Sequence, residues 1–286
     1  MKAVPSFEVL TPSSLQEALS LLSEDGDALP YAGGTDVMPM MRRGKLAPKK
    51  VVDLSGIREL SYVRAEGQAF KVGGLTPIQD FALSPVIPDR YQSVKSLTVY
   101  FGSEATRHMA TVGGNLASGG ERDVPLILTS LDGYVRVVSS RGERVAGPSD
   151  VQLRRDELIV EARFDDWGRN AFSWFAKYEK RASNGIGVVT AGVALRVEDG
   201  FAERLRIVLN RVDGRRMGRV YGLEEELTGC RLSDARVRDA VERHVSRIKP
   251  SSDFRASSEF RKHVSKVLVR RGLEHCWRVL TGSGWA

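Results

Sequence analysis

Two glycine-pair loops are the parts of this sequence whose residue types and spacing best suit the binding of an anion. They are Ala32-Gly33-Gly34-Thr35-Asp36 and Ala110-Thr111-Val112-Gly113-Gly114-Asn115. Glycine has no Cβ, so each backbone can come close to a ligand, and successive N–H groups in such a turn can hold an anion. The first loop alone is as typical of a tight strand-to-helix turn. Two loops with one layout favour a single extended ligand with a pyrophosphate at its middle.

The second loop carries the larger set of polar groups. Thr111 has a hydroxyl, the N–H groups of Gly113 and Gly114 are candidate donors, and Asn115 can both donate and accept hydrogen bonds. The first loop lacks the glycine spacing of the dinucleotide fingerprint, so it does not indicate a Rossmann unit.

Three further residues could contact such a ligand. Phe101 can stack on a planar ring, or it can simply fill the core. Asp123 can bind a polyol hydroxyl and can also cap the helix expected from Pro125. Lys177 shares a strand face with Phe175 and Glu179, which would direct it at an anionic or electron-rich group. From spacing alone, an exposed strand lysine is the simpler interpretation.

The sequence shows no residue set that would carry out catalysis without a cofactor. Two distant cysteines, Cys230 and Cys276, and four scattered histidines have no metal-ligand spacing, so neither an iron–sulfur cluster nor structural zinc is expected. No Ser–His–Asp set or paired-carboxylate motif stands out. Redox chemistry would therefore need a bound cofactor.

The elements that must position these residues differ between the two halves of the chain. Strands and helices alternate over residues 7–54, which predicts a small, mostly parallel α/β unit. Hairpins are expected at 61–73 and 134–146, with a strand at 158–164. Beyond 165–170, three strands are expected at 171–178, 188–197 and 205–209. Helices follow, and the last of them is expected at 257–271 with Gly272 as its end.

Length and composition restrict the class of protein. A chain of 286 residues with 42% hydrophobic and 28% charged residues is typical of a globular protein of about two domains. No apolar run reaches the roughly 20 residues of a membrane span, and the first residues lack the apolar run of a signal peptide. We therefore expect a cytoplasmic protein with no membrane span. The net charge of +7 comes without a nucleic-acid motif, which favours an acidic partner protein over nucleic acid.

These motifs together resemble the flavin-binding medium subunit of the molybdenum hydroxylases, which include xanthine, aldehyde and carbon monoxide dehydrogenases. The matching segments are YAGGTDVMPMMRRG at 31–44, VVDLSGIREL at 51–60, FGSEATRHMATVGGNLASGGERDVP at 101–125, FAKYEKRASNGIGVVTAGVAL at 175–195 and SSEFRKHVSKVLVRRGLEHC at 257–276. The resemblance implies an α+β fold. A two-lobed FAD-binding domain of the p-cresol methylhydroxylase type would cover 1–168, with lobes of about 1–55 and 56–168. A C-terminal domain at 169–286 would hold a three-stranded antiparallel sheet with a helical bundle.

The resemblance also implies non-covalently bound FAD, with its pyrophosphate between the lobes. Ile159 or Val160 would contribute backbone contacts. Two departures from the family pattern are charged residues at Glu121-Arg122 and the pair Asn210-Arg211 in place of two glycines. The implied cofactor-binding residues are Tyr31, Ala32, Gly33, Gly34, Thr35, Asp36, Val37, Phe101, Ala110, Thr111, Val112, Gly113, Gly114, Asn115, Asp123, Val160 and Lys177.

The implied function is electron transfer within a molybdenum-dependent oxidoreductase of the aldehyde or carbon monoxide dehydrogenase kind. A large molybdopterin subunit and a small iron–sulfur subunit would be the partners, in a paired heterotrimer. The molybdenum cofactor and the clusters would lie on those partners only. Electrons would leave FAD for a small-molecule acceptor. Two alternatives remain open here, namely a self-sufficient FAD-dependent oxidase or reductase and a non-redox nucleotide-binding module.

Overall fold

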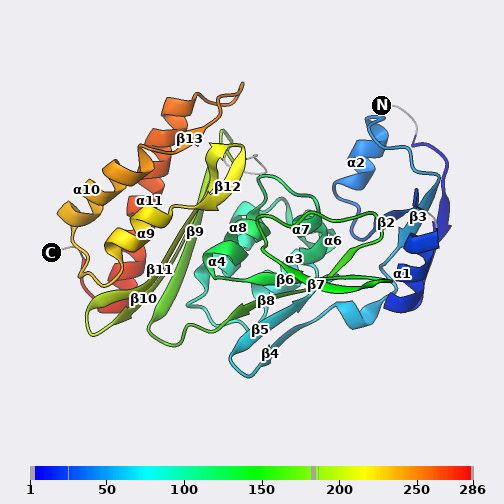
Figure 1. Ribbon diagram of the computed structural model, residues 1–286, viewed down its shortest axis with the longest axis horizontal. Helices are drawn as coiled ribbons and strands as arrows, with labels where there is room; N and C mark the ends of the chain where they lie inside the picture. Colours follow the sequence, from blue (N-terminus) through cyan, green and yellow to red (C-terminus); the bar gives the residue numbers. More distant parts are fainter. Residues whose placement is uncertain (1–3, 25, 182–184, 186, 285–286) are drawn as a thin grey trace.

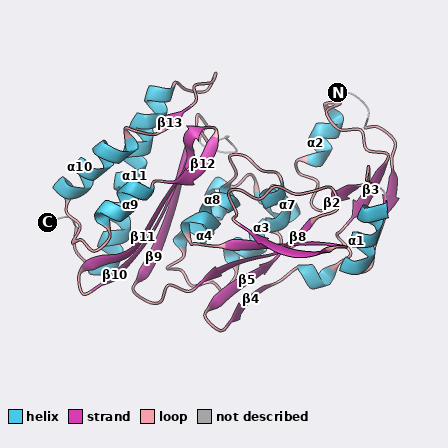
Figure 2. Ribbon diagram, viewed as in Figure 1, coloured by secondary structure: helices cyan, strands magenta, loops and turns pink. Residues whose placement is uncertain are grey.

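The computed structural model describes residues 4–24, 26–181, 185 and 187–284. In this part of the chain it shows an α+β fold built on three sheets, which follow one another along the molecule from the N-terminal to the C-terminal end (Figure 1). Figure 2 shows helices on the faces of each sheet. The α+β fold expected from the sequence is confirmed.

The first unit is the parallel α/β unit that the alternating pattern predicts. Its sheet has the order β1-β3-β2, and both strand pairs are parallel. Leu19 and Leu22 of its first helix pack with Val52 of the central strand in a small core. Its elements are β1 (Glu8–Leu10), α1 (Leu15–Glu24), β2 (Leu29–Tyr31), α2 (Val37–Arg42), β3 (Lys50–Asp53) and the 3₁₀ helix η1 (Arg58–Leu60).

The middle unit is an antiparallel sheet of order β4-β5-β8-β6-β7, covered by short helices. Phe70, Tyr91 and Phe164 meet in its core with ring centroids 5.2–5.5 Å apart. Two of its short helices, at Gln92–Lys95 and Leu97–Tyr100, meet at Ser96. The elements are β4 (Val63–Glu66), β5 (Ala69–Gly73), α3 (Ile78–Leu83), α4 (Gln92–Lys95), α5 (Leu97–Tyr100), α6 (Glu104–Met109), α7 (Val112–Ala117), α8 (Asp123–Ser130), β6 (Tyr134–Ser139), β7 (Gly142–Ala146) and β8 (Leu158–Asp165).

The third unit contains the three long antiparallel strands that were expected, together with two short ones. β11 runs on to Gly214, pairs with β12, and has β13 beside it in parallel. The charged segment Arg211-Val212-Asp213 hides this extension, since it breaks the apolar pattern of a strand. The elements are β9 (Ala171–Tyr178), β10 (Val189–Glu198), β11 (Phe201–Gly214), β12 (Arg216–Arg219), α9 (Tyr221–Leu227), α10 (Asp234–Val245), β13 (Lys249–Pro250) and α11 (Ser258–Thr281).

The third sheet is covered on both faces. Helices α9, α10 and α11 pack on one side (Figure 1), around Leu195, Leu209 and Leu273. On the other side Phe175 and Val208 join the core of the middle unit. The third sheet therefore connects the helical end of the molecule with the unit that carries the second glycine loop.

The prediction that the last helix ends at Gly272 is wrong. Helix α11 continues to Thr281 and ends at Gly282, whose φ of 69° is left-handed. Gly272 is buried within the helix, where an added Cβ would lie 2.6 Å from Cε3 of Trp174. The glycine thus permits close packing of helix on sheet, and it does not terminate the helix.

Across the described ranges, no helix is both long and apolar enough to cross a membrane. The same residues contain no group of three or more His, Cys, Asp or Glu side chains that could hold a metal ion.

Candidate cofactor-binding site

A cavity of about 1030 Å³ lies where the first and middle units meet, and it extends to the third unit at Lys177. Both glycine loops line it. Ligand cavities in proteins usually measure about 300–1,000 Å³, so this one suits a large ligand.

The two loops touch each other through their backbones. An added Cβ at Gly33 would lie only 1.6 Å from the carbonyl oxygen of Met109, immediately before the second loop. Gly113 is also closely packed, though less so, because an added Cβ there would lie 2.6 Å from the carbonyl oxygen of Gly74. The sequence predicted that the two loops meet at one ligand, and the structure brings them into contact.

The first loop has free backbone donors. In the part of the chain that the structure describes, the N–H groups of residues 33–36 donate to no protein acceptor. Gly34 has a left-handed φ of 66°, which a side chain would strain. An added Cβ there would also lie 2.1 Å from the hydroxyl of Tyr31. The loop can therefore offer successive N–H groups to an anion.

The second loop uses its amides differently from the prediction. The N–H of Gly113 donates to the carbonyl of Gly74 at 2.8 Å, and the N–H of Gly114 donates to Oγ1 of Thr111 at 3.1 Å. These two amides cap α7 and anchor it to the sheet, so the expectation that they are spare donors is wrong. The Thr111 hydroxyl can still donate its own proton. Asn115 accepts from the N–H of Val124 through Oδ1 at 3.2 Å, which leaves its Nδ2 as a donor.

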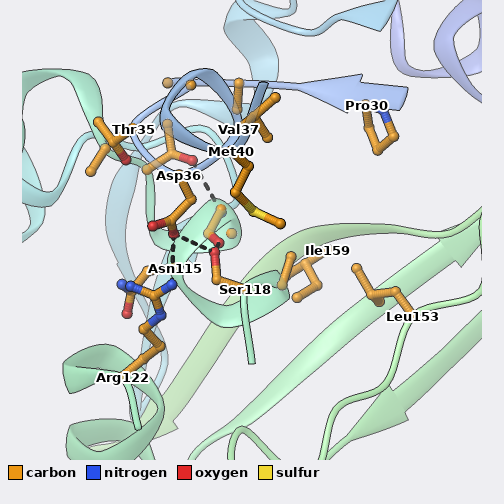
Figure 3. A pocket seen from close by; sticks show the side chains of 18 of the residues that line it. Pro30, Thr35, Asp36, Val37, Met40, Asn115, Ser118, Arg122, Leu153 and Ile159 are labelled. Atoms are coloured by element: carbon orange, nitrogen blue, oxygen red, sulfur yellow. Dashed lines mark hydrogen bonds and ion pairs between the residues drawn. The ribbon is translucent and has the colours of Figure 1, made fainter. Parts of the chain in front are cut away.

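Asp36 connects the first loop to the segment after the second (Figure 3). Its Oδ2 accepts from Oγ of Ser118 at 2.7 Å and pairs with Nη2 of Arg122 at 3.0 Å. These contacts cross the seam between the first and middle units. Arg122 is thereby held at the cavity wall beside the free N–H groups of the first loop.

At its far side the cavity meets a buried charge cluster on Lys177. Its Nζ donates to Oδ2 of Asp123 at 2.9 Å and to the carbonyl of Tyr100 at 3.1 Å. Oε1 of Glu179 lies 3.3 Å from the same nitrogen. Burial raises the pKa of Asp123, and the charge of Lys177 opposes that rise. Lys177 is 8% exposed, so the exposed lysine that spacing alone favoured is not what the structure shows.

Most of the predicted site residues line the cavity. Tyr31, Val112 and Val160 do not belong to its lining, and Ile159 lines it where either Ile159 or Val160 was expected. Tyr31 instead packs beneath Gly34, while Val112 and Val160 are buried in the core. The predicted residues in the lining are Ala32, Gly33, Gly34, Thr35, Asp36, Val37, Phe101, Ala110, Thr111, Gly113, Gly114, Asn115, Asp123 and Lys177.

Apart from Ile159, sequence reasoning missed the apolar wall of the cavity, and it missed the segment between β7 and β8. Met40 and Pro30 of the first unit face Leu153 and Ile159 across the cavity (Figure 3). Leu153 belongs to the segment 147–157, which links β7 to β8 and reaches the first unit through the ion pair of Arg155 with Asp27 at 3.0 Å. No local pattern marks this segment as part of a site, since it contains neither a glycine pair nor a cap.

Glu157 holds the segment 147–157 in place. Its carboxylate accepts from Nε and Nη2 of Arg144 at 2.9 and 2.8 Å, and from the N–H of Arg154 at 2.8 Å. The hydrogen bonds from Arg144 are the main cause that lowers the pKa of Glu157 from 4.5 to about 2. A lowered pKa stabilises the fold above the unfolded value, and this contribution is lost as the pH falls toward 2.

We expect Glu157→Gln to lower the free energy of unfolding by about 2 kcal/mol at pH 7, because it removes charge-assisted hydrogen bonds. The difference from wild type should shrink between pH 4.5 and 2, where wild-type Glu157 itself takes up a proton. Urea unfolding at a series of pH values measures both effects. A difference that is as large at pH 2.5 as at pH 7 would contradict this account.

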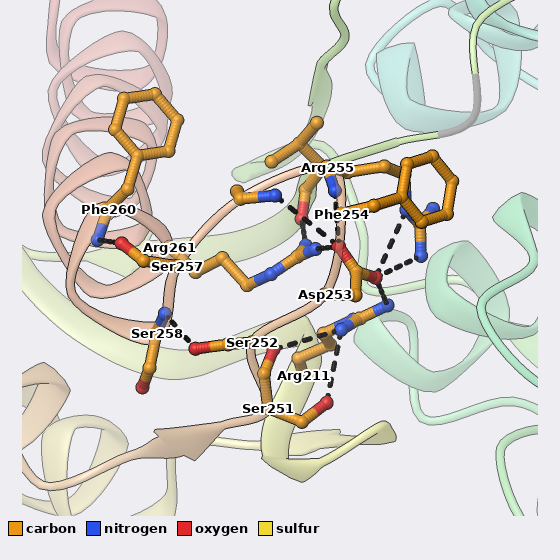
Figure 4. Close-up of polar contacts among 12 residues, drawn as sticks. Arg211, Ser251, Ser252, Asp253, Phe254, Arg255, Ser257, Ser258, Phe260 and Arg261 are labelled. Atoms are coloured by element: carbon orange, nitrogen blue, oxygen red, sulfur yellow. Dashed lines mark hydrogen bonds and ion pairs between the residues drawn. The ribbon is translucent and has the colours of Figure 1, made fainter.

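Three of the four residues that depart from the pattern noted in the sequence, Glu121, Arg122 and Arg211, pair with one another or with the first loop. Glu121 lines the cavity and pairs with Arg211 and Arg255 of the third unit. Arg211 and Arg255 also bind Asp253, at 3.0 and 2.8 Å, and Arg261 reaches it at 2.6 Å (Figure 4). Although burial raises it, the pKa of Asp253 is held well below its usual range by hydrogen bonds from Arg255 and the charge of Arg261.

Arg211 is 2% exposed and is not among the described residues that line the cavity. Asn210 accepts from the N–H of Thr190 at 3.0 Å inside the third sheet. Neither residue is placed to contact a ligand in the cavity. Arg211 therefore serves the junction between the middle and third units, while Asn210 holds strands of the third sheet together.

Comparison with known proteins gives the class of protein that this fold and cavity define. The FAD-binding domain in molybdopterin dehydrogenases matches residues 5–163, more than half of the chain, and the C-terminal domain of the carbon monoxide dehydrogenase flavoprotein matches residues 174–276. The chain therefore belongs to the family of FAD-binding subunits of molybdenum hydroxylases, and it is part of a multi-subunit oxidoreductase.

Individual relatives align with this chain over nearly its full length. The glyceraldehyde dehydrogenase medium chain of Sulfolobus acidocaldarius is 26% identical and covers 94% of this chain and 98% of its own. The nicotine 6-hydroxylase medium subunit of Paenarthrobacter nicotinovorans is 28% identical, with 94% and 96% covered. A solved structure of carbon monoxide dehydrogenase from Hydrogenophaga pseudoflava has the same fold, with a TM-score of 0.90 at 24% identity and 96% and 99% covered.

The residues of the cavity fit FAD. Its walls combine free N–H groups for a diphosphate, glycines at which a Cβ would collide with backbone, and an apolar side between Met40 and Leu153. An elongated dinucleotide needs such a combination of polar and apolar surface along one cavity.

Proposed function

We propose that this chain holds FAD in the cavity between its first two units and passes electrons through it to an external acceptor. The contact between the two glycine loops carries the proposal. Both loops line the same cavity, and their glycines let a ligand come close to the backbone of each. Bound flavin would supply the redox chemistry, since it exchanges electrons with both one- and two-electron partners.

The chain's own residues would bind and orient the cofactor. The free N–H groups of residues 33–36 would bind the diphosphate. The Thr111 hydroxyl and Asn115 Nδ2 would donate from the second loop. Asp123 and Lys177 would line the side of the cavity nearest the third unit. Tyr31, Val112 and Val160 would support the loops from beneath.

We propose the domain division 1–168 and 169–286, with lobes of about 1–55 and 56–168. The separate family matches to 5–163 and 174–276 support it. The proposed partners are a large molybdopterin subunit and a small iron–sulfur subunit in a paired heterotrimer, with molybdenum and the clusters on those partners. Their support is that similar chains are named medium chains or medium subunits. Oxidation of an aldehyde or of carbon monoxide is the proposed overall reaction, and the cytoplasmic location stays a prediction.

The test is the flavin content of the full-length chain, purified alone and with its partners. We expect visible flavin absorbance with about one FAD per chain, released into the supernatant by denaturation because the flavin is not covalently bound. Chain that carries no flavin, and takes none up when FAD is added to the folded protein, would refute the proposal.

A further inference from the structure

We propose that Arg122 is an additional diphosphate-binding residue of this cavity, oriented by Asp36 and Ser118. The inference rests on the proposed function, since it assigns a residue to the FAD diphosphate. The guanidinium of Arg122 would add a positively charged contact that neither glycine loop contains.

Arg122 differs from the other positively charged residues of the cavity because most of its N–H groups have no protein acceptor among the described residues. Its side chain is 37% exposed at the wall, and within the described ranges its one side-chain ion pair joins Nη2 to Oδ2 of Asp36 at 3.0 Å. Five N–H groups in a fork suit phosphate oxygens in pairs. Most of these groups thus remain available to a ligand.

The other cations are less suited to the diphosphate. Lys177 is already surrounded by two carboxylates and a carbonyl. Arg155 is 77% exposed and pairs with Asp27, which is itself 76% exposed. Arg154 is 69% exposed beside Glu157. Arg122 alone among these four is tied to the first glycine loop.

The position of Asp36 makes a cation necessary here. Its carboxylate belongs to the loop whose free N–H groups would bind the diphosphate, and like charges repel strongly in a partly buried cavity. Arg122 neutralises Asp36 and keeps N–H groups available beside the same loop. Ser118, which donates to the same oxygen of Asp36 at 2.7 Å, fixes the carboxylate between them.

The experiment compares ligands with and without the diphosphate. Full-length chain freed of flavin is titrated with FAD and with riboflavin, which keeps the ring system and lacks phosphate. We expect Arg122→Gln to weaken FAD binding about 10- to 100-fold, as for the loss of charge-assisted hydrogen bonds, and to change riboflavin binding less than about twofold. The matched control is Arg136→Gln, which removes an arginine of 39% exposure from a surface ion pair at 3.1 Å, and it should leave both affinities unchanged.

Asp36→Asn separates a ligand contact from a structural tie between the two units. If Arg122 binds the diphosphate, Asp36→Asn removes a repulsive charge but keeps a side-chain oxygen that can still accept from Arg122 and Ser118, so FAD should bind as tightly as to wild type or tighter. If Arg122 only ties the units together, Asp36→Asn and Arg122→Gln should weaken FAD and riboflavin alike, which would overturn the inference. Wild-type FAD affinity that Arg122→Gln leaves unchanged would also overturn it while the proposed function stands. No FAD binding by wild type would overturn both.

Discussion

Chain carrying Gly33→Ala is expected to lose FAD on purification. The added Cβ would lie 1.6 Å from the carbonyl oxygen of Met109, far inside the contact distance of any two atoms. The oxygen belongs to the backbone, so it cannot rotate away as a side chain could, and the two loops must separate. Since both loops line the same cavity, their separation removes donors from both sides of a diphosphate at once. We expect FAD affinity to fall more than about 100-fold, with overpacking also costing about 1–3 kcal/mol of stability.

Gly56→Ala is the matched control in the same unit. An added Cβ at Gly56 would meet only the carbonyl oxygen of Pro12, at 3.5 Å, an ordinary contact. Flavin absorbance per chain and FAD titration measure the effect, and circular dichroism shows whether each variant is folded. A folded Gly33→Ala chain with wild-type FAD affinity would show that the contact between the loops is not needed for binding.

The sequence predicted the parts of the site that are encoded locally. A glycine pair between a strand and a polar residue is visible in five residues, and the first loop, the strand before it, the helix after it and the parallel first unit were predicted. The two short helices α6 and α7 were not predicted, although the second glycine pair lies within α7. Asp123 and Lys177 were each assigned to the site, but the sequence did not predict their pairing. They stand 54 residues apart, and the 2.9 Å contact between them depends on how α8 packs against the third sheet, to which β9 belongs.

The parts that sequence could not predict depend on distant partners. The use of the Gly113 amide depends on the carbonyl of Gly74, and the role of Glu121 depends on Arg211, 90 residues away. Gly272 shows the same limit in the fold. Its sequence context is typical of a helix end, yet the Trp174 ring on β9 occupies the space that a side chain would need. A local pattern cannot distinguish a glycine that ends a helix from one that permits close packing.

Lys177→Met is expected to be the most destabilising single change at the cavity. Lys177, Asp123 and Glu179 are each 8–10% exposed, so removing the lysine leaves two carboxylates buried side by side. Removing one partner of a buried ion pair costs about 3–5 kcal/mol, because the remaining charge has lost its compensation. The control is Lys266→Met, whose 2.7 Å pair with Glu242 lies at the surface, with Glu242 66% exposed. Such pairs contribute about 0–1 kcal/mol.

The pH dependence identifies electrostatics as the cause. Burial already raises the pKa of Asp123 in the wild type, and Lys177 is the main group that lowers it. Without the lysine this pKa must rise further, so the folded variant binds protons that the unfolded chain releases. A raised pKa favours the fold at low pH, and that advantage is lost as pH rises through the folded value. Urea unfolding should therefore show the defect of Lys177→Met shrinking from pH 8 toward pH 5. A defect of constant size would instead indicate lost packing of the lysine's methylene chain, with no charge left unpaired in the cavity wall.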